Sequence, residues 1–112
     1  MLVEFYLSSN GRSPVFEFIH EQEKANKAMI LAVLKDIQHF GFNAKGCLFK
    51  NLGKKLWEIK IRTVSTGYRF LYALMESNKI IILHGFKKKT QKTPLKEITL
   101  ARKRLNEITQ KY

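Results

Sequence analysis

Hydrophobic residues recur along this chain at two spacings, and each spacing predicts a different element. From residue 24 to residue 40 the apolar side chains fall on one helical face, and Gly41 ends the pattern. A shorter helix is predicted from Ser13-Pro14 to about residue 22, because Ser13 is a capping residue and proline suits the first helical position. The two helices are expected to form a hairpin with an apolar seam that includes Phe40.

Runs rich in β-formers predict four strands, one at the N-terminus and three after the helical hairpin. Their expected residues are 2–7, 56–63, 67–75 and 79–86. Residues 43–53 contain two glycines and are predicted to be a loop. The short links between the later strands favour an antiparallel meander, and the apolar run at residues 80–83 favours a central position for its last strand.

Thr93-Pro94 repeats the cap-and-proline pattern and predicts a last helix from Pro94 to about Gln110. Its apolar face is expected to include Leu95, Ala101 and Leu105. The order β-α-α-β-β-β-α over residues 1–112 is typical of a single α+β domain, a small antiparallel sheet with helices packed on one face. The sequence leaves open whether the last helix closes over the candidate site or packs away from it.

Alternation separates charged from apolar side chains on the strand that starts at residue 56. Trp57, Ile59 and Ile61 share one face, which must meet the helices, because a one-residue slip would bury three charges. The opposite face carries Glu58, Lys60 and Arg62. Arg69 of the next strand is expected to share this face, so we expect both arginines on an open side of the sheet.

The distribution of charge along the chain indicates the class of partner that the protein binds. The chain has a net charge of +12, and all of the excess lies in residues 50–112, which hold sixteen Lys and Arg against four acids. Such a concentration favours a polyanion, of which nucleic acid is the natural candidate. No apolar run is long enough for a membrane span, and no basic N-terminal segment suggests a signal peptide.

Metal and disulfide chemistry find little support in the sequence. Cys47 stands alone, and His20, His39 and His84 lack the spacing of metal ligands. We therefore expect a reduced, cytoplasmic protein without a cofactor.

Arginines within apolar strands need a partner, and two readings stay open for Arg62 and Arg69. They pair with Glu58 in a structural ion pair, or they clamp a phosphate, and the two roles are compatible. His84 lies near the end of the last strand and is a candidate for acid–base work.

Three segments together resemble a known family. They are Leu56-Trp57-Glu58-Ile59-Lys60-Ile61-Arg62, Tyr68-Arg69-Phe70-Leu71-Tyr72, and residues 83–94 with the string Phe-Lys-Lys-Lys-Thr-Gln-Lys-Thr-Pro. They resemble the phage Gp49-like branch of the RelE/ParE toxin superfamily, whose nearest relatives are HigB-type toxins. The resemblance implies a RelE-like fold and the toxin of a type II toxin–antitoxin system. It further implies a ribosome-dependent, metal-independent mRNA endoribonuclease that inhibits translation.

The resemblance also implies roles for particular residues. Glu58, Arg62 and Arg69 match family strand patterns, with Arg69 at the position usually needed for cleavage, and Lys87 lies where relatives carry lysine, histidine or tyrosine. We expect the arginines to stabilise the phosphorane, Glu58 to act as base, and Lys54 or Lys87 to protonate the leaving group. The expected RNA-binding residues are Lys50, Lys55, Lys60, Lys88, Lys89 and His84.

The resemblance suggests a helix-turn-helix, HigA-like antitoxin as partner in a hetero-oligomer, besides the ribosome and mRNA. No membrane partner is expected. The superfamily also contains gyrase poisons, so the alternative is a non-nuclease toxin or a binding module that acts on gyrase or other nucleic-acid complexes.

Overall fold

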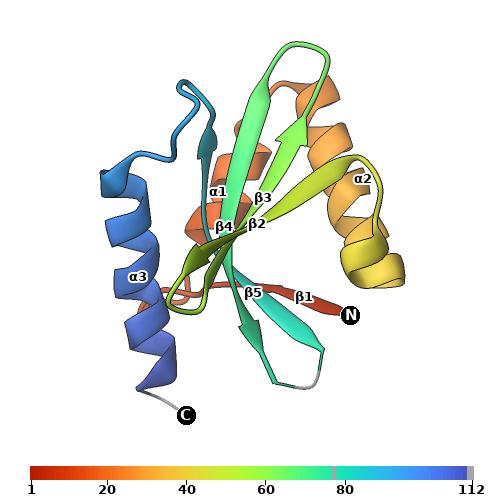
Figure 1. The fold of residues 1–112 in the computed structure, drawn as a ribbon. Coiled ribbons are helices and arrows are strands. Elements are labelled where there is room, and N and C mark those ends of the chain that lie inside the picture. Colours follow the sequence, from red (N-terminus) through yellow and green to blue (C-terminus); the bar gives the residue numbers. More distant parts are fainter. Residues whose placement is uncertain (77, 111–112) are drawn as a thin grey trace.

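The computed structural model describes residues 1–76 and 78–110 as three helices and a five-stranded sheet (Figure 1). The elements, in chain order, are β1 (Leu2–Phe5), α1 (Pro14–His20), α2 (Lys24–Phe40), the 3-10 turn η1 (Gly41–Asn43), β2 (Cys47–Gly53), β3 (Leu56–Arg62), β4 (Gly67–Met75), β5 (Lys79–Lys87) and α3 (Leu95–Thr109). The sheet order is β1-β5-β4-β3-β2. The α+β class is confirmed, and the arrangement is consistent with the RelE-like fold.

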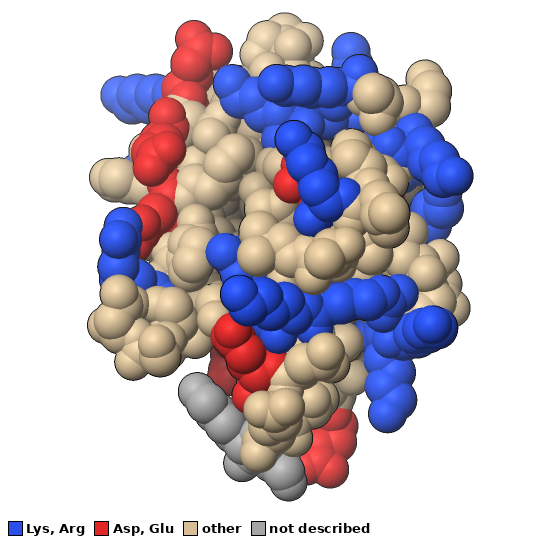
Figure 2. Space-filling model, turned by 90° about the vertical axis from the view of Figure 1, so that its left-hand side faces the viewer, with Lys and Arg blue, Asp and Glu red and all other residues tan. Residues whose placement is uncertain are grey.

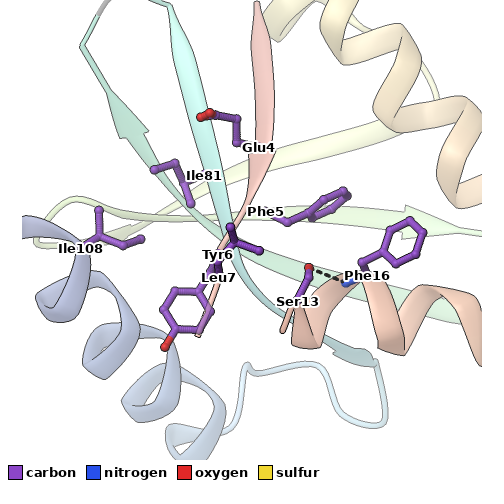
Figure 3. A pocket seen from close by; sticks show the side chains of 8 residues that line it. All are labelled: Glu4, Phe5, Tyr6, Leu7, Ser13, Phe16, Ile81 and Ile108. Atoms are coloured by element: carbon purple, nitrogen blue, oxygen red, sulfur yellow. Dashed lines mark hydrogen bonds between the residues drawn. The ribbon is translucent and has the colours of Figure 1, made fainter. Parts of the chain in front are cut away.

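The helical hairpin follows its sequence signals closely. The Ser13 hydroxyl accepts the backbone N–H of Phe16 at 3.3 Å, which caps α1 (Figure 3). The helix α2 has the predicted bounds and ends where Gly41 adopts a φ of 58°, a conformation that glycine reaches without steric cost. The prediction was wrong for Phe40, which is exposed at the last position of α2.

The three-stranded meander and the central position of β5 are confirmed. Two features of the sheet differ from expectation. The segment predicted as a loop contains β2, an edge strand whose inward residues Cys47 and Phe49 alternate with the exposed Leu48 and Lys50. The sheet is also mixed rather than antiparallel, because β1 pairs with β5 in parallel. The predicted link between β4 and β5 includes residue 77, which lies outside the described residues.

Helices cover both faces of the sheet, so the prediction that they share one face is wrong. The side chains of Ile59, Tyr68 and Phe70 pack against α1 and α2 in one core. The opposite face packs Leu71 and Ala73 against Ala101 and Leu105 of α3 in a second core. The helix α3 begins one residue later than predicted, and Leu95 is exposed at its start.

Side-chain alternation on β3 is confirmed. Trp57, Ile59 and Ile61 pack in the core under the helical hairpin, and Leu56 and Glu58 point to the α3 side. None of the helices in the described ranges is both long and apolar enough to cross a membrane.

Candidate nucleic-acid interface

A group of charged side chains lies on the α3 side of the sheet, over β2, β3 and β4. In the strand register Lys50 lies opposite Glu58, Lys60 opposite Arg69, and Arg62 opposite Gly67. Figure 2 looks at this side of the molecule and shows Lys and Arg over its upper edge, centre and right, with most acidic side chains toward the left edge and the bottom. The concentration of charge seen in the sequence therefore becomes a cationic surface.

The open part of this face lies over β2 and the end of β3 that carries Lys60 and Arg62. The helix α3 and the segment of residues 88–94, which joins β5 to α3, cover β4, β5 and the part of β3 around Glu58. Glu58 and Arg69 are both completely buried, so the expectation that they lie on an open face is wrong. The reason lies in the tertiary structure. The local sequence pattern around Glu58 and Arg69 is that of an exposed strand face, but residues 88–94, which are distant in the sequence, fold over both side chains.

The buried pair is held by contacts from above and from within the sheet. Arg69 Nε lies 3.6 Å from Glu58 Oε1, so the ion pair that the sequence left open is formed between these two residues. From the covering segment, the Thr93 hydroxyl donates to Glu58 Oε2, and Arg69 Nη2 donates to the Gln91 carbonyl. Thr93 is therefore not the helix cap that its place before proline predicts: Pro94 occupies the capping position, and α3 begins at Leu95 without a side-chain cap.

The pair is incompletely satisfied. Glu58 Oε1 and the Nε and Nη1 of Arg69 have no hydrogen-bond partner among residues 1–76 and 78–110, although none of these atoms reaches solvent. Lys60 Nζ lies 3.9 Å from Glu58 Oε1, within the range of an ion pair. Since buried polar atoms are nearly always paired, this cluster has the unused hydrogen-bonding capacity of a site built for a further polar group.

Beside the buried pair, a pocket of about 400 Å³ opens between β2, β3, the start of β4 and the segment after β5. Three cations contribute to its lining: Lys60, Arg62 and Lys88. The Lys88 N–H donates to the Gly67 carbonyl at 2.8 Å, which fixes that lysine beside the strand position opposite Arg62. Arg62 is exposed, so its guanidinium is free to meet an anion from solvent.

The remaining predicted site residues lie elsewhere. Lys54 and Lys55 form the turn between β2 and β3, at the end of β3 away from Arg62 and about 20 Å along the strand from it. Lys87 lies opposite Tyr68 and lines a hollow with Phe18 of α1.

Lys89 is exposed on the covering segment and lines the same hollow as Lys87. The structure thus brings Lys50, Lys60, Arg62 and Lys88 onto one surface, and it does not bring Lys54, Lys55 or Lys87 there.

His84 is engaged with α3. Its Nε2 lies 2.9 Å from Glu97 Oε1, and its ring stacks on Phe86 with the centroids 5.3 Å apart. Burial lowers the pKa of His84 below its ordinary value, while the hydrogen bond that the ring makes to the Glu97 carboxylate opposes that shift. Within the described ranges no three His, Cys, Asp or Glu side chains gather in a way that could hold a metal ion.

A different, mainly apolar hollow has a volume of about 650 Å³, larger than the pocket beside the buried pair (Figure 3). It lies beside β1, between the start of α1 and α3, and its lining includes Phe5, Phe16 and Ile108. None of the predicted site residues lines it, so size alone does not identify the functional site.

Sequence reasoning missed two residues that shape the site, Gln91 and Thr93. Both were part of the string that carries the family resemblance, yet no local pattern indicates that a backbone carbonyl and a hydroxyl from this string reach β3 and β4. The strand β2 was also missed, although the alternation of Cys47 and Phe49 with Leu48 and Lys50 was a signal for it.

Comparison with known proteins places the chain in a family. No curated protein matches it. The family model of Phage derived protein Gp49-like (DUF891) matches residues 17–106, which contain α2, all of β2 to β5 and the covering segment. This match is consistent with the Gp49/HigB-type branch of RelE-like toxins and supports a toxin-like, phage-derived protein. The chain therefore belongs to the Gp49-like family of phage-derived proteins.

Proposed function

We propose that this protein is the toxin of a type II toxin–antitoxin pair and inhibits translation by cutting mRNA on the ribosome. The observation that carries the proposal is the convergence of Lys60, Arg62 and Lys88 on a pocket beside the buried Glu58–Arg69 pair. A cluster of cations at this density suits a phosphodiester backbone. The toxin-like family supports a toxic action for this protein.

The proposed reaction is transfer of a phosphodiester to the neighbouring ribose hydroxyl. The 2′-oxygen attacks phosphorus while its proton passes to Glu58, and the bond from phosphorus to the 5′-oxygen breaks. Arg62 and Arg69 stabilise the charge on the phosphorane oxygens. A lysine protonates the departing 5′-oxygen, so the products are a 2′,3′-cyclic phosphate and a 5′-hydroxyl.

Geometry favours Lys60 as this proton donor over the residues expected from the sequence. Its Nζ lies 3.9 Å from Glu58 Oε1, whereas Lys54 is at the far turn and Lys87 faces α1. Lys50, Lys88 and Lys89 are proposed to bind phosphates of mRNA and ribosomal RNA. Substrate positioning is left to the ribosome.

A toxin-like family implies an antitoxin partner. We propose a helix-turn-helix, HigA-like protein in a cytoplasmic hetero-oligomer that neutralises the toxin by covering the cationic surface. An acidic antitoxin surface would complement the net charge of +12.

The test is a cleavage assay on purified translating ribosomes, with the cut ends of the mRNA mapped. Because Arg62 is exposed, Arg62→Ala should fold normally and lower the rate of cutting by at least a factor of about 100, the loss typical of a removed transition-state donor. Arg12→Ala removes the same charge from an exposed Arg–Glu pair away from the site and should cut like the wild type. If Arg62→Ala also cuts like the wild type, the site assignment is wrong.

One observation favours the alternative, a non-nuclease toxin that binds gyrase or another nucleic-acid complex. Glu58 is completely buried, and a buried carboxylate takes no proton from RNA while it stays covered. A binder would inhibit gyrase supercoiling and leave ribosome-bound mRNA intact, and Glu58→Gln would not weaken its effect. A nuclease that uses Glu58 as base would lose its rate in the same variant.

A further inference from the structure

We propose that residues 91–93 close the site as an internal substitute for RNA and must lift before a phosphate and a ribose reach Arg69 and Glu58. The proposal rests on the proposed function for the identity of the ligand. It goes beyond that function in two ways. Residues 91–93 are proposed to compete with RNA for Arg69 and Glu58, and these two residues are proposed to form a site that is covered in the resting protein.

The contacts of the segment imitate those of the substrate. The Gln91 carbonyl oxygen accepts from Arg69 Nη2, as a non-bridging phosphate oxygen would. The Thr93 hydroxyl donates to Glu58 Oε2, as a ribose 2′-hydroxyl would before it loses its proton. One residue of the segment thus occupies the phosphate side of the pair, and another occupies the sugar side.

The imitation is incomplete, and its gaps favour an anion. A guanidinium has five N–H donors, and a single carbonyl leaves Nε and Nη1 of Arg69 buried without a hydrogen-bond partner among the described residues, with Nε in ion-pair contact alone with Glu58 Oε1 at 3.6 Å. A phosphate has several acceptor oxygens and is bound by arginine through two parallel hydrogen bonds. RNA would therefore satisfy donors that the closed segment leaves unused.

The segment is built to move without disturbing the sheet. Residues 88–94 form neither helix nor strand, and residues 89–92 are exposed. Among the described residues, the segment is hydrogen-bonded to the rest of the domain by the Lys88 N–H to Gly67 at one end and by Gln91 and Thr93 to Arg69 and Glu58 at the other. Thr93 is the buried residue of the segment, so its hydroxyl is the contact that most directly holds the segment down.

If residues 91–93 lift, Arg69 and Glu58 would form one continuous site with the cationic surface. Lys60 contacts Glu58 from the open side of the pair and also lines the pocket with Arg62 and Lys88. A strand of RNA held on Arg62 and Lys88 would therefore reach Arg69 by displacing residues 91–93. Lys89 and Lys92 are exposed on the segment and would attract RNA phosphates to it.

The first experiment measures affinity for a fluorescent ten-nucleotide 2′-O-methyl oligoribonucleotide, which cannot be cut by the proposed reaction. Thr93→Val removes the hydroxyl that holds the segment and should tighten binding at least threefold, since a closed state lowers apparent affinity. Thr90→Val is the matched control, because the Thr90 hydroxyl bonds the Lys92 carbonyl within the segment and should leave affinity unchanged. In an Arg69→Gln background, Thr93→Val should bring no gain, because the uncovered donor is missing.

The second experiment needs no variant and uses the arginine side-chain N–H resonances of the wild-type protein during titration with the same oligonucleotide. Shifts of the Arg69 Nε–H and the Thr93 amide support opening. A titration that moves the Arg62 resonance and leaves Arg69 and Thr93 unchanged overturns the proposal, as does equal affinity of wild type and folded Thr93→Val. The ribosome cleavage assay tests the proposed function separately. If the segment opens on RNA but the protein does not cut mRNA, the proposed function is wrong, and the proposal that residues 91–93 cover the site is retained.

Discussion

Arg69 and Glu58 meet across neighbouring strands where neither reaches solvent, with Arg69 Nε 3.6 Å from Glu58 Oε1. Two opposite charges in such a place depend on each other, because removal of one takes from the other its buried counter-charge. The pair therefore ties the candidate chemistry to the stability of the fold, and the two effects must be measured separately.

Arg69→Gln should lower the free energy of unfolding by about 3–5 kcal/mol, since the buried Glu58 carboxylate loses its buried partner and keeps only the partly exposed Lys60 nearby. Arg62→Gln, on the exposed end of β3, should change it by less than about 0.5 kcal/mol. Urea denaturation followed by far-UV circular dichroism measures both.

The double variant Glu58→Gln/Arg69→Gln should be more stable than the sum of the single effects predicts, with a coupling energy of about 1–3 kcal/mol. Strict additivity in this cycle would show that the two groups do not depend on each other for stability.

RNA binding should lose salt dependence when a cation of the surface is removed. Arg62→Ala and Lys88→Ala should each reduce the slope of log Kd against log salt concentration by about 0.7, the value for one phosphate contact on a single strand. Arg12→Ala should leave the slope unchanged, because Arg12 is paired with Glu17 near the start of α1. Fluorescence anisotropy over 50 to 200 mM salt, roughly the range in which such contacts are lost, provides the slopes. Equal slopes in all four proteins would exclude this surface as the binding site.

Stability should fall on mild acidification because of His84. Burial holds the pKa of His84 below its unfolded value, so the unfolded chain binds the proton more readily. The stability from the neutral ring is fully present above the unfolded pKa of about 6.5 and declines as the pH drops from there toward the lowered folded pKa. Urea midpoints at neutral and mildly acidic pH should therefore differ more for the wild type than for His84→Gln. A difference of the same size in both proteins would assign the pH dependence to other groups.

Gly85 in β5 should not tolerate a methyl group. A Cβ at this position would lie 2.5 Å from Cε1 of Phe70, inside the core under the helical hairpin. Gly85→Ala should cost about 1–3 kcal/mol of stability, the range for overpacking. Gly67→Ala is the matched control, since its Cβ would meet Lys88 at 3.4 Å and its φ is not positive. Thermal unfolding compares the two, and equal melting temperatures would contradict this view of the core.

Much of the fold was predictable because its signals are local. The Ser13 cap, the bounds of α2 and its end at Gly41 all depend on residues within one helical turn of each feature. The inward set of β3 followed from alternation, which depends only on the geometry of an extended chain. β2 escaped prediction because it is an edge strand flanked by glycines, with one face exposed.

By itself the sequence determined the three helices and every strand except β2, the face of β3 that carries Glu58, Lys60 and Arg62, and the region where the positive charge gathers. Only the tertiary structure decided that α3 crosses to that face and that residues 91–93 cover Glu58 and Arg69. An apolar stripe shows that a helix must pack but not which side of a sheet receives it, and alternation assigns a side chain to a face without showing what lies above it. The exposure of the two central residues therefore depended on contacts between positions more than twenty residues apart.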